Sequence, residues 1–131
     1  MTTEDRWHLQ GSADYAYSGD EARNLLRHRL DWGNPETWFE SDAGRLLGVV
    51  TNGERAMVTW VDAEGGPGEH LVDPRGEGSS GGFALSNGQA GSYADRDTVA
   101  FDVAGHAVAH FIDHGSWPPT GVSVASGRGA H

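Results

Sequence analysis

The sequence contains no cysteine and no lysine, and these two absences exclude several kinds of chemistry. Without cysteine there can be no disulfide, no thiolate nucleophile and no cysteine-ligated zinc or iron–sulfur site. Because all nine basic residues are arginine, a P-loop ammonium, a lysine Schiff base and a Ser–Lys dyad are excluded as well. The chain also lacks an apolar run of about 18 residues, and its N-terminus, MTTEDRWHLQ, is acidic. We therefore expect a soluble protein that, unless exported by another route, is cytoplasmic.

Positive charge is scarce relative to negative charge. Nine arginines stand against 19 aspartates and glutamates, which gives a formal net charge of −10 over 131 residues. This charge opposes binding to nucleic acid or to an anionic membrane, because affinity for both comes largely from neutralising phosphates. It favours a basic partner, although an acidic balance can also serve solubility alone. The length suits a single domain over 1–131, and we expect residues 1–12 and 126–131 to be flexible.

Two stretches carry the apolar periodicity of amphipathic helices. In YSGDEARNLLRHRLD (17–31), Ser18 and Glu21 match a capping box that precedes apolar residues at helical spacing. In FDVAGHAVAHFIDH (101–114), a broad apolar face recurs at the same spacing, and Gly115 followed by two prolines provides a stop signal. The pattern therefore predicts helices over about 19–31 and 102–114.

Between these helices the pattern is typical of short strands. RLLGVVT and RAMVTWVDA flank Asn52–Gly53, which is the strongest hairpin signal in the chain, and EHLVD follows as a strand that stops at Pro74. FALSN is predicted as a fourth strand, TVAF as a fifth strand or the lead-in to the second helix, and TGVSVA as a closing strand. DWGNPETWFES (31–41) is interpreted as a break in the pattern. We therefore expect an α+β fold, with an antiparallel β-sheet packed against two main helices in a single domain.

The most unusual segment is GEGSSGGFALSNGQAG (76–91), which holds six of the 20 glycines. Glycine is costly to order, so this composition needs a reason. A phosphate-binding Walker loop is excluded by the missing lysine and by the strand predicted to follow. Ser79 and Ser80 lack the strand-to-helix elbow of a GxSxG nucleophile. A recognition loop and an irregular crossover both remain open.

A polar stripe of histidines follows the second predicted helix. His106, His110 and His114 are spaced by four residues and continue from Asp102. Imidazoles at i and i+4 can chelate zinc, but the HExxH glutamate and an evident third ligand are missing. The favoured interpretation is a solvated helix face, with no metal and no cofactor. A small metal- or ligand-binding domain that uses this stripe stays the alternative.

Three segments resemble a known family: TNGERAMV (51–58), GEHLVDPRGEGSSGGFALSNGQ (68–89) and FIDHGSWPPTGVSV (111–124). They are similar to the first-numbered immunity family of bacterial polymorphic-toxin systems, which is frequent in actinobacteria, and the match covers roughly residues 20–125. The resemblance implies a small α+β protein that binds and inhibits a cognate toxin, often a nucleic-acid deaminase or another toxin acting inside cells. The family has no catalytic motif, so the resemblance does not imply an enzymatic activity.

The resemblance and the charge together predict an immunity protein, not an enzyme, that occludes the basic active-site cleft of a toxin. Nucleic acid and membranes are not expected as partners. Carboxylates near each other, such as Asp95 and Asp97, can perform acid–base catalysis, but on an acidic surface they are usually solvated. The candidate toxin contacts are Trp38 as an aromatic anchor and the loop residues Asp73, Arg75, Glu77, Ser79, Ser80, Asp95 and Asp97.

Overall fold

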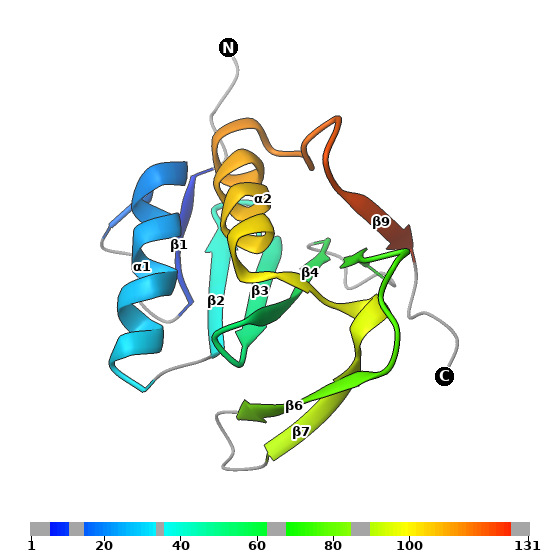
Figure 1. Cartoon of the computed structure of the whole chain (residues 1–131). Coiled ribbons are helices and arrows are strands. Elements are labelled where there is room, and N and C mark those ends of the chain that lie inside the picture. The colour runs from blue at the N-terminus through cyan, green and yellow to red at the C-terminus, as the bar shows by residue number, and fades with distance from the viewer. Residues whose placement is uncertain (1–5, 11–14, 34–35, 63–67, 85–89, 127–131) are drawn as a thin grey trace.

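The computed structural model describes residues 6–10, 15–33, 36–62, 68–84 and 90–126 (Figure 1). Its elements, in chain order, are β1 (Trp7–Leu9), α1 (Gly19–Asp31), β2 (Glu36–Ser41), β3 (Leu46–Thr51), β4 (Arg55–Val61), β5 (Glu69–Val72), β6 (Ser79–Ala84), β7 (Ala90–Ala94), the 3-10 turn η1 (Asp95–Asp97), β8 (Val99–Ala100), α2 (Phe101–His114) and β9 (Ser123–Ser126).

One main sheet dominates the fold, and every strand pair in it is antiparallel. Its strand order is β1-β2-β3-β4-β5-β9, and β8 also pairs with β4. The strands β6 and β7 form a separate antiparallel hairpin, which extends below the main sheet in Figure 1. The predicted α+β class, with an antiparallel sheet and two helices, is confirmed.

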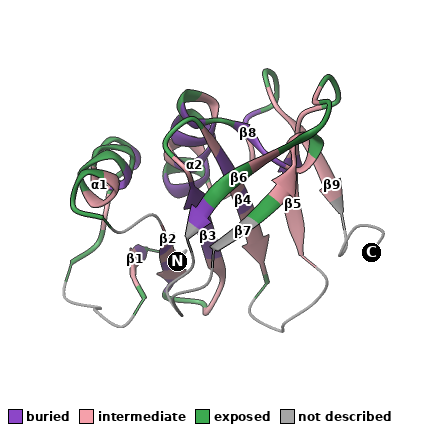
Figure 2. Cartoon of the chain, turned by 60° about the horizontal axis from the view of Figure 1, so that its bottom comes forward, coloured by how far each residue is buried: buried purple, intermediate pink, exposed green. Residues whose placement is uncertain are grey.

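The core lies where the two helices pack against the sheet (Figure 2). Leu47 and Val49 of β3 are fully buried with Val108 of α2, and β3 is buried on both faces from Leu47 to Thr51, whereas burial alternates along the first half of β4, at Ala56 and Val58. This alternation places every second side chain of a strand on the same face of the sheet. The apolar faces of the two helices, which the sequence predicts, therefore pack against the apolar face of the sheet and shield it from solvent.

Local signals set the helix ends as the sequence predicts. The Ser18 hydroxyl accepts a hydrogen bond from the Glu21 N–H (3.2 Å), and the Glu21 carboxylate accepts one from the Ser18 N–H (2.9 Å). At the other helix, Gly115 adopts a positive φ of 76° and donates its N–H to the Phe111 carbonyl at 2.7 Å. The capping box and the glycine stop are both confirmed.

A second contact joins the start of α1 to the last turn of α2. The Gly19 N–H donates to the carboxylate of Asp113 at 2.8 Å, so an acidic side chain of α2 satisfies a free donor at the start of α1. A β-carbon on Gly19 would lie 2.4 Å from the Ala109 carbonyl oxygen, so only glycine permits this approach. The contact fixes α1 against α2 on the sheet.

The central hairpin also forms where the sequence predicts it. Thr51 of β3 pairs with Ala56 of β4, and residues 52–54 form the loop between the two strands. The Asn52 side-chain oxygen accepts hydrogen bonds from the N–H groups of Glu54 (2.9 Å) and Arg55 (2.8 Å). With EHLVD as β5, TVAF divided between β8 and α2, and TGVSVA ending in β9, the order of the later elements is also as expected. FALSN contributes Phe83 and Ala84 to β6, and its remainder lies outside the described residues.

Two strands differ from the sequence expectations. Residues 1–12 were expected to be flexible, but Trp7–Leu9 forms β1, and Trp7 is 1% exposed with its ring edge-on to Phe111. The segment interpreted as a break contains β2, whose Thr37, Phe39 and Ser41 are buried. At the other end of the chain, Ser126 closes β9 by pairing with Glu69. Residues 1–5, 11–12 and 127–131 lie outside the described part of the chain.

Candidate functional site

The predicted contact loops are organised around Arg55, the first residue of β4. Its Nε donates to the Thr98 hydroxyl (2.6 Å), and its Nη2 donates to the carbonyls of Thr98 (3.0 Å) and Asp95 (3.1 Å). The same Nη2 pairs with the Asp73 carboxylate at 3.0 Å, while Nε lies 3.9 Å from the Asp95 carboxylate. One guanidinium therefore joins the start of β4 to the end of β5 and to η1. We call Arg55, Asp73, Asp95 and Thr98 the Arg55 cluster.

The loop between β5 and β6 is also tied to η1 through its backbone. The Asp73 N–H donates to the Arg96 carbonyl (2.7 Å), and the Asp95 N–H donates to the Gly78 carbonyl (3.0 Å). The Ser80 hydroxyl donates to the Asp95 carboxylate. A β-carbon on Gly76 would lie 2.6 Å from the Arg96 nitrogen, so this approach requires glycine. These bonds fix the loop over the turn.

The electrostatics of Asp73 follow from this geometry. The Arg55 guanidinium hydrogen-bonds its carboxylate, the Arg75 N–H donates to the other oxygen at 3.1 Å, and both hold the pKa of Asp73 below its usual value. The side chain of Asp73 keeps 32% of its surface exposed and that of Asp95 keeps 21%. Both carboxylates therefore hold the loops in place while presenting only part of their charge to solvent.

The remaining predicted loop residues lie around this cluster. Asp97 is half exposed, and its carboxylate lies 3.4 Å from Nε2 of His70. Arg75, Glu77 and Ser79 are exposed on the β5–β6 connection and the start of β6. The structure thus brings Asp73, Ser80 and Asp95 together and places the other four predicted loop residues beside them.

Trp38 does not join this site. It lies on β2, which is separated from β5 by β3 and β4, and its indole N–H donates to the Glu36 carboxylate at 2.9 Å. Its ring covers Gly48, where a β-carbon would lie 2.4 Å from the ring. The side chain also lines a hollow of about 240 Å³ with Leu9, Gln10, Arg29 and Glu36. Among the described large hydrophobic residues, those that are exposed are Trp32 (67%) and Tyr15 (51%).

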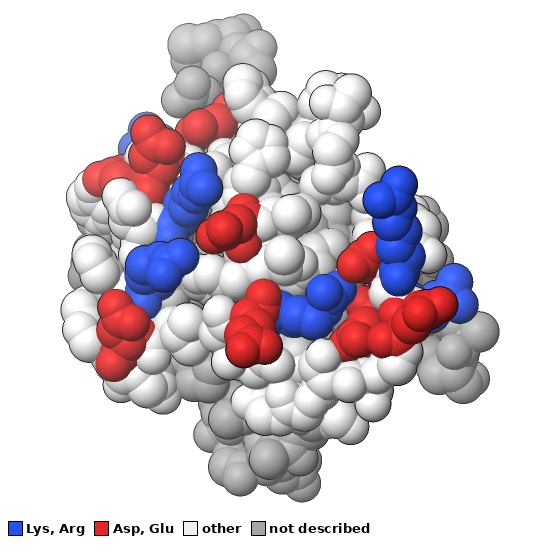
Figure 3. Space-filling model, viewed as in Figure 1, with Lys and Arg blue, Asp and Glu red and all other residues white. Residues whose placement is uncertain are grey.

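Charge on the visible face is mixed, as Figure 3 shows. Acidic side chains gather on the right of this view, in the region of η1 and the connection between β5 and β6, and arginines lie beside them. The acidic loops therefore form a local grouping of charge within a face that also carries arginine.

The histidine stripe presents two neighbouring imidazoles. His106 and His114 are exposed, and the rings of His110 and His114 lie 4.4 Å apart. Nδ1 of His110 lies 2.9 Å from the Ser116 carbonyl oxygen. Within the described residues, no group of three or more His, Asp or Glu side chains is placed to hold a metal ion. Asp102, at the start of the stripe, lies 3.7 Å from the Arg27 guanidinium.

Comparisons of the chain with protein-family models, curated proteins and solved structures found no match. Membership of the immunity family therefore stays a prediction from the three sequence segments. Of the two helices in the described part of the chain, with 13 and 14 residues, neither has the length and apolar character needed to cross a membrane.

Sequence reasoning missed Arg55 and Thr98, although they organise the site. Thr98 is fully buried and donates its hydroxyl to the Asp95 carbonyl at 3.0 Å. Arg55 is separated from Asp73 by 18 positions and from Thr98 by 43, so no local pattern connects them. The signal in the sequence is one arginine two residues after Gly53, at the start of a strand that is otherwise mostly apolar.

Proposed function

We propose that this protein is an immunity protein, active in the cytoplasm, that binds and inhibits a cognate bacterial toxin. The expected toxin is a nucleic-acid deaminase or nuclease, and inhibition occurs by occlusion of its basic active-site cleft. The observation that carries the proposal is the Arg55 cluster, which holds an acid-bearing loop and η1 in one arrangement before any partner binds. Preorganised loops lose less conformational entropy on binding, which favours high affinity.

The charge of the loops supports a basic partner. Glu77 is exposed and can meet a positive surface without leaving an internal partner, and Asp97, whose carboxylate lies 3.4 Å from Nε2 of His70, is half exposed. Complementary charge mainly accelerates association, and a net charge of −10 acts in the same direction over longer distances. A toxin whose substrate is a polyanion has the matching basic cleft.

The residue types that the sequence lacks support a binding protein without catalytic activity. The chain has no cysteine and no lysine. The serines of the glycine-rich segment also belong to the loop network: Ser80 donates to Asp95, and the N-terminal part of this segment is fixed against η1. Turnover of a nucleotide or peptide substrate that disappears in His106→Ala or His110→Ala would contradict this part of the proposal.

The direct test uses the cognate toxin domain, which the proposal expects to be encoded by a neighbouring gene. Association and dissociation rates of the purified pair are measured at about 20 mM and about 150 mM salt, over which the screening length falls to about 8 Å. We expect slower association at the higher salt concentration and for Glu77→Arg, with dissociation little changed.

The matched control is Asp31→Arg, which changes the net charge equally at an exposed position in the last turn of α1. If Asp31→Arg and Glu77→Arg slow association equally, the effect is one of net charge and the acidic loops do not dock. If the toxin neither binds nor is inhibited, the immunity function itself is wrong.

The alternative function, a small metal-binding domain, is favoured by the close pair His110 and His114. Zinc titration by calorimetry, with His114→Ala as the variant, tests it. Stoichiometric binding that is lost in the variant would support the alternative, because two imidazoles one helical turn apart can share a metal ion.

A further inference from the structure

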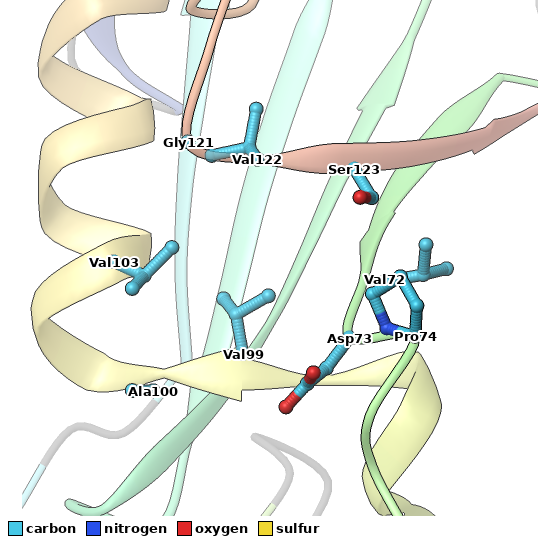
Figure 4. Close-up of a pocket in the computed structure, with 9 residues that line it drawn as sticks. All are labelled: Val72, Asp73, Pro74, Val99, Ala100, Val103, Gly121, Val122 and Ser123. Carbon is cyan, nitrogen blue, oxygen red and sulfur yellow. The ribbon is translucent and has the colours of Figure 1, made fainter.

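The main sheet divides at β4, and this division creates a pocket. The first residues of β4 pair with β8, through Arg55 with Ala100 and Ala56 with Val99, whereas Thr59 and Trp60 pair with β5. Since β5 and β8 use the same edge of β4, they separate from each other. Between them lies a pocket of about 380 Å³ (Figure 4), lined by Val72, Asp73, Pro74, Val99, Ala100, Val103, Gly121, Val122 and Ser123. We call it the fork pocket.

The lining of the fork pocket combines apolar walls with the polar side chains of Asp73 and Ser123. Valines from β5, β8, α2 and the segment before β9 supply its walls, as Figure 4 shows, and Asp73 lies at the end of β5. Asp73 is the charged residue of this lining. A pocket with aliphatic walls and one carboxylate suits a ligand with an aliphatic stem and a cationic end.

The charge balance around Asp73 favours a cation over an anion. Around Asp73, four carboxylates (Asp73, Glu77, Asp95 and Asp97) stand against three guanidinium groups (Arg55, Arg75 and Arg96), so the region keeps a small excess of negative charge. A carboxylate has about four acceptor positions, and the bonds from Arg55 and from the Arg75 N–H leave room for a further donor. The lowered pKa of Asp73 keeps this group ionised at neutral pH.

We propose that the fork pocket receives an arginine or lysine side chain of the bound toxin, with its aliphatic stem against the valines and its cationic head on Asp73. This inference rests on the proposed immunity function and adds a specific anchor to it. The pocket adjoins the acidic loops through Asp73, so one bound segment can occupy both. Basic anchors of this kind bury their stems in apolar pockets and hydrogen-bond through their heads.

The test uses the isolated full chain and a defined probe. Methyl and amide NMR spectra are recorded while N-acetyl-L-argininamide is added, and N-acetyl-L-citrullinamide serves as a neutral probe of nearly the same shape. We expect saturable shifts at Val99, Val103 and Val122, with binding of the neutral probe weaker on the order of tenfold, because a charged hydrogen bond is lost.

Two matched variants identify the pocket as the binding site. Val103→Phe fills the pocket from the first turn of α2, and His106→Phe adds the same ring at an exposed position one turn later. Val103→Phe should abolish the saturable shifts, whereas His106→Phe should leave them intact. Val122→Phe fills the pocket from the opposite wall and replaces Val103→Phe if that variant does not fold.

The outcomes separate this inference from the proposed function. Equal binding of the charged and neutral probes, or binding that survives both filling variants, overturns the fork pocket as a basic-side-chain site even where the toxin is inhibited. Unchanged toxin affinity in a folded filling variant also overturns it. A toxin that is neither bound nor inhibited, with probe binding intact, overturns the immunity function and leaves the cation preference of the pocket established.

Discussion

Replacing Arg55 by methionine should measure how strongly the Arg55 cluster stabilises the fold. Methionine keeps an unbranched apolar stem but removes every donor of the guanidinium. The hydrogen bonds to the Thr98 hydroxyl, the Thr98 carbonyl and the Asp95 carbonyl are lost, and Thr98 is fully buried. At about 1 kcal/mol net for each hydrogen bond, the free energy of unfolding should fall by about 2–3 kcal/mol.

The ion pair with Asp73 is left out of this sum because partly exposed pairs contribute little. A domain of this size has an unfolding free energy of about 5–15 kcal/mol, so the expected loss is a large fraction of the total. Urea unfolding, followed by tryptophan fluorescence and circular dichroism, measures it. Amide hydrogen exchange should also accelerate at residues 73–78 and 95–98, where the lost bonds held the backbone.

The control for this experiment is Arg27→Met, since Arg27 is also paired with an aspartate. Its side chain is 61% exposed, and the pair with Asp102 spans 3.7 Å, so the expected loss is below about 1 kcal/mol. If Arg55→Met costs no more than Arg27→Met and leaves hydrogen exchange unchanged, water replaces the guanidinium and the cluster does not preorganise the loops.

Three further predictions concern Gly76 and Asp73 in the same region and the exposed Trp32. Gly76→Ala should destabilise the protein by about 1–3 kcal/mol in urea unfolding, because its β-carbon meets the Arg96 backbone, whereas Gly81→Ala, with open space around it, should be nearly neutral; equal effects would contradict the packing argument. Because the pKa of Asp73 is lowered on folding, its contribution is present above the unfolded value near 3.8 and is lost as the pH falls through the folded value. Unfolding measured between about pH 5 and pH 2 should therefore show a smaller acid-induced loss in Asp73→Asn, and an unchanged slope would refute the linkage. Trp32→Ala should leave the unfolding free energy nearly unchanged, because the side chain is 67% exposed, but should accelerate toxin dissociation if Trp32 is an anchor; unchanged dissociation would exclude that role.

The elements that the sequence predicts well are those with a local physical signal. The capping box at Ser18, the stop at Gly115 and the turn at Asn52–Gly53 each act within a few residues, and all three are present in the structure. The apolar stripes of α1 and α2 depend on helical spacing alone. Local signals of this kind can be recognised without knowing what packs against them.

The elements that were missed depend on distant partners. β1 has three residues, and its pairing with β2 places Trp7 opposite Ser41. In β2 the buried face carries Thr37, which is 2% exposed and accepts a hydrogen bond from Nε of Arg29. A polar residue facing the core interrupts the apolar alternation by which strands are recognised. Neither the pairing nor the arginine partner can be deduced from the sequence around these strands.

The candidate site illustrates the same limit in its charges. From the sequence, Asp73, Glu77, Asp95 and Asp97 are equivalent acids on one connection, and all were predicted to face the toxin. In the structure the Arg55 guanidinium divides them, because Asp73 and Asp95 hold the loops while Glu77 stays exposed. The glycine-rich segment is divided likewise: Gly76 permits a close backbone approach, whereas Gly78 and Gly82 adopt positive φ angles of 79° and 83°.

This division determines which charge reversal can test the proposed mechanism. Asp73→Arg would place a second guanidinium beside Arg55, so weaker toxin binding could result from displaced loops and not from lost charge complementarity. Glu77→Arg changes an exposed position with no such consequence for the Arg55 cluster. A loss of association rate in Glu77→Arg with unchanged hydrogen exchange at residues 73–78 therefore reports on docking. The same loss in Asp73→Arg is interpretable only if the exchange rates show that the loop has kept its place.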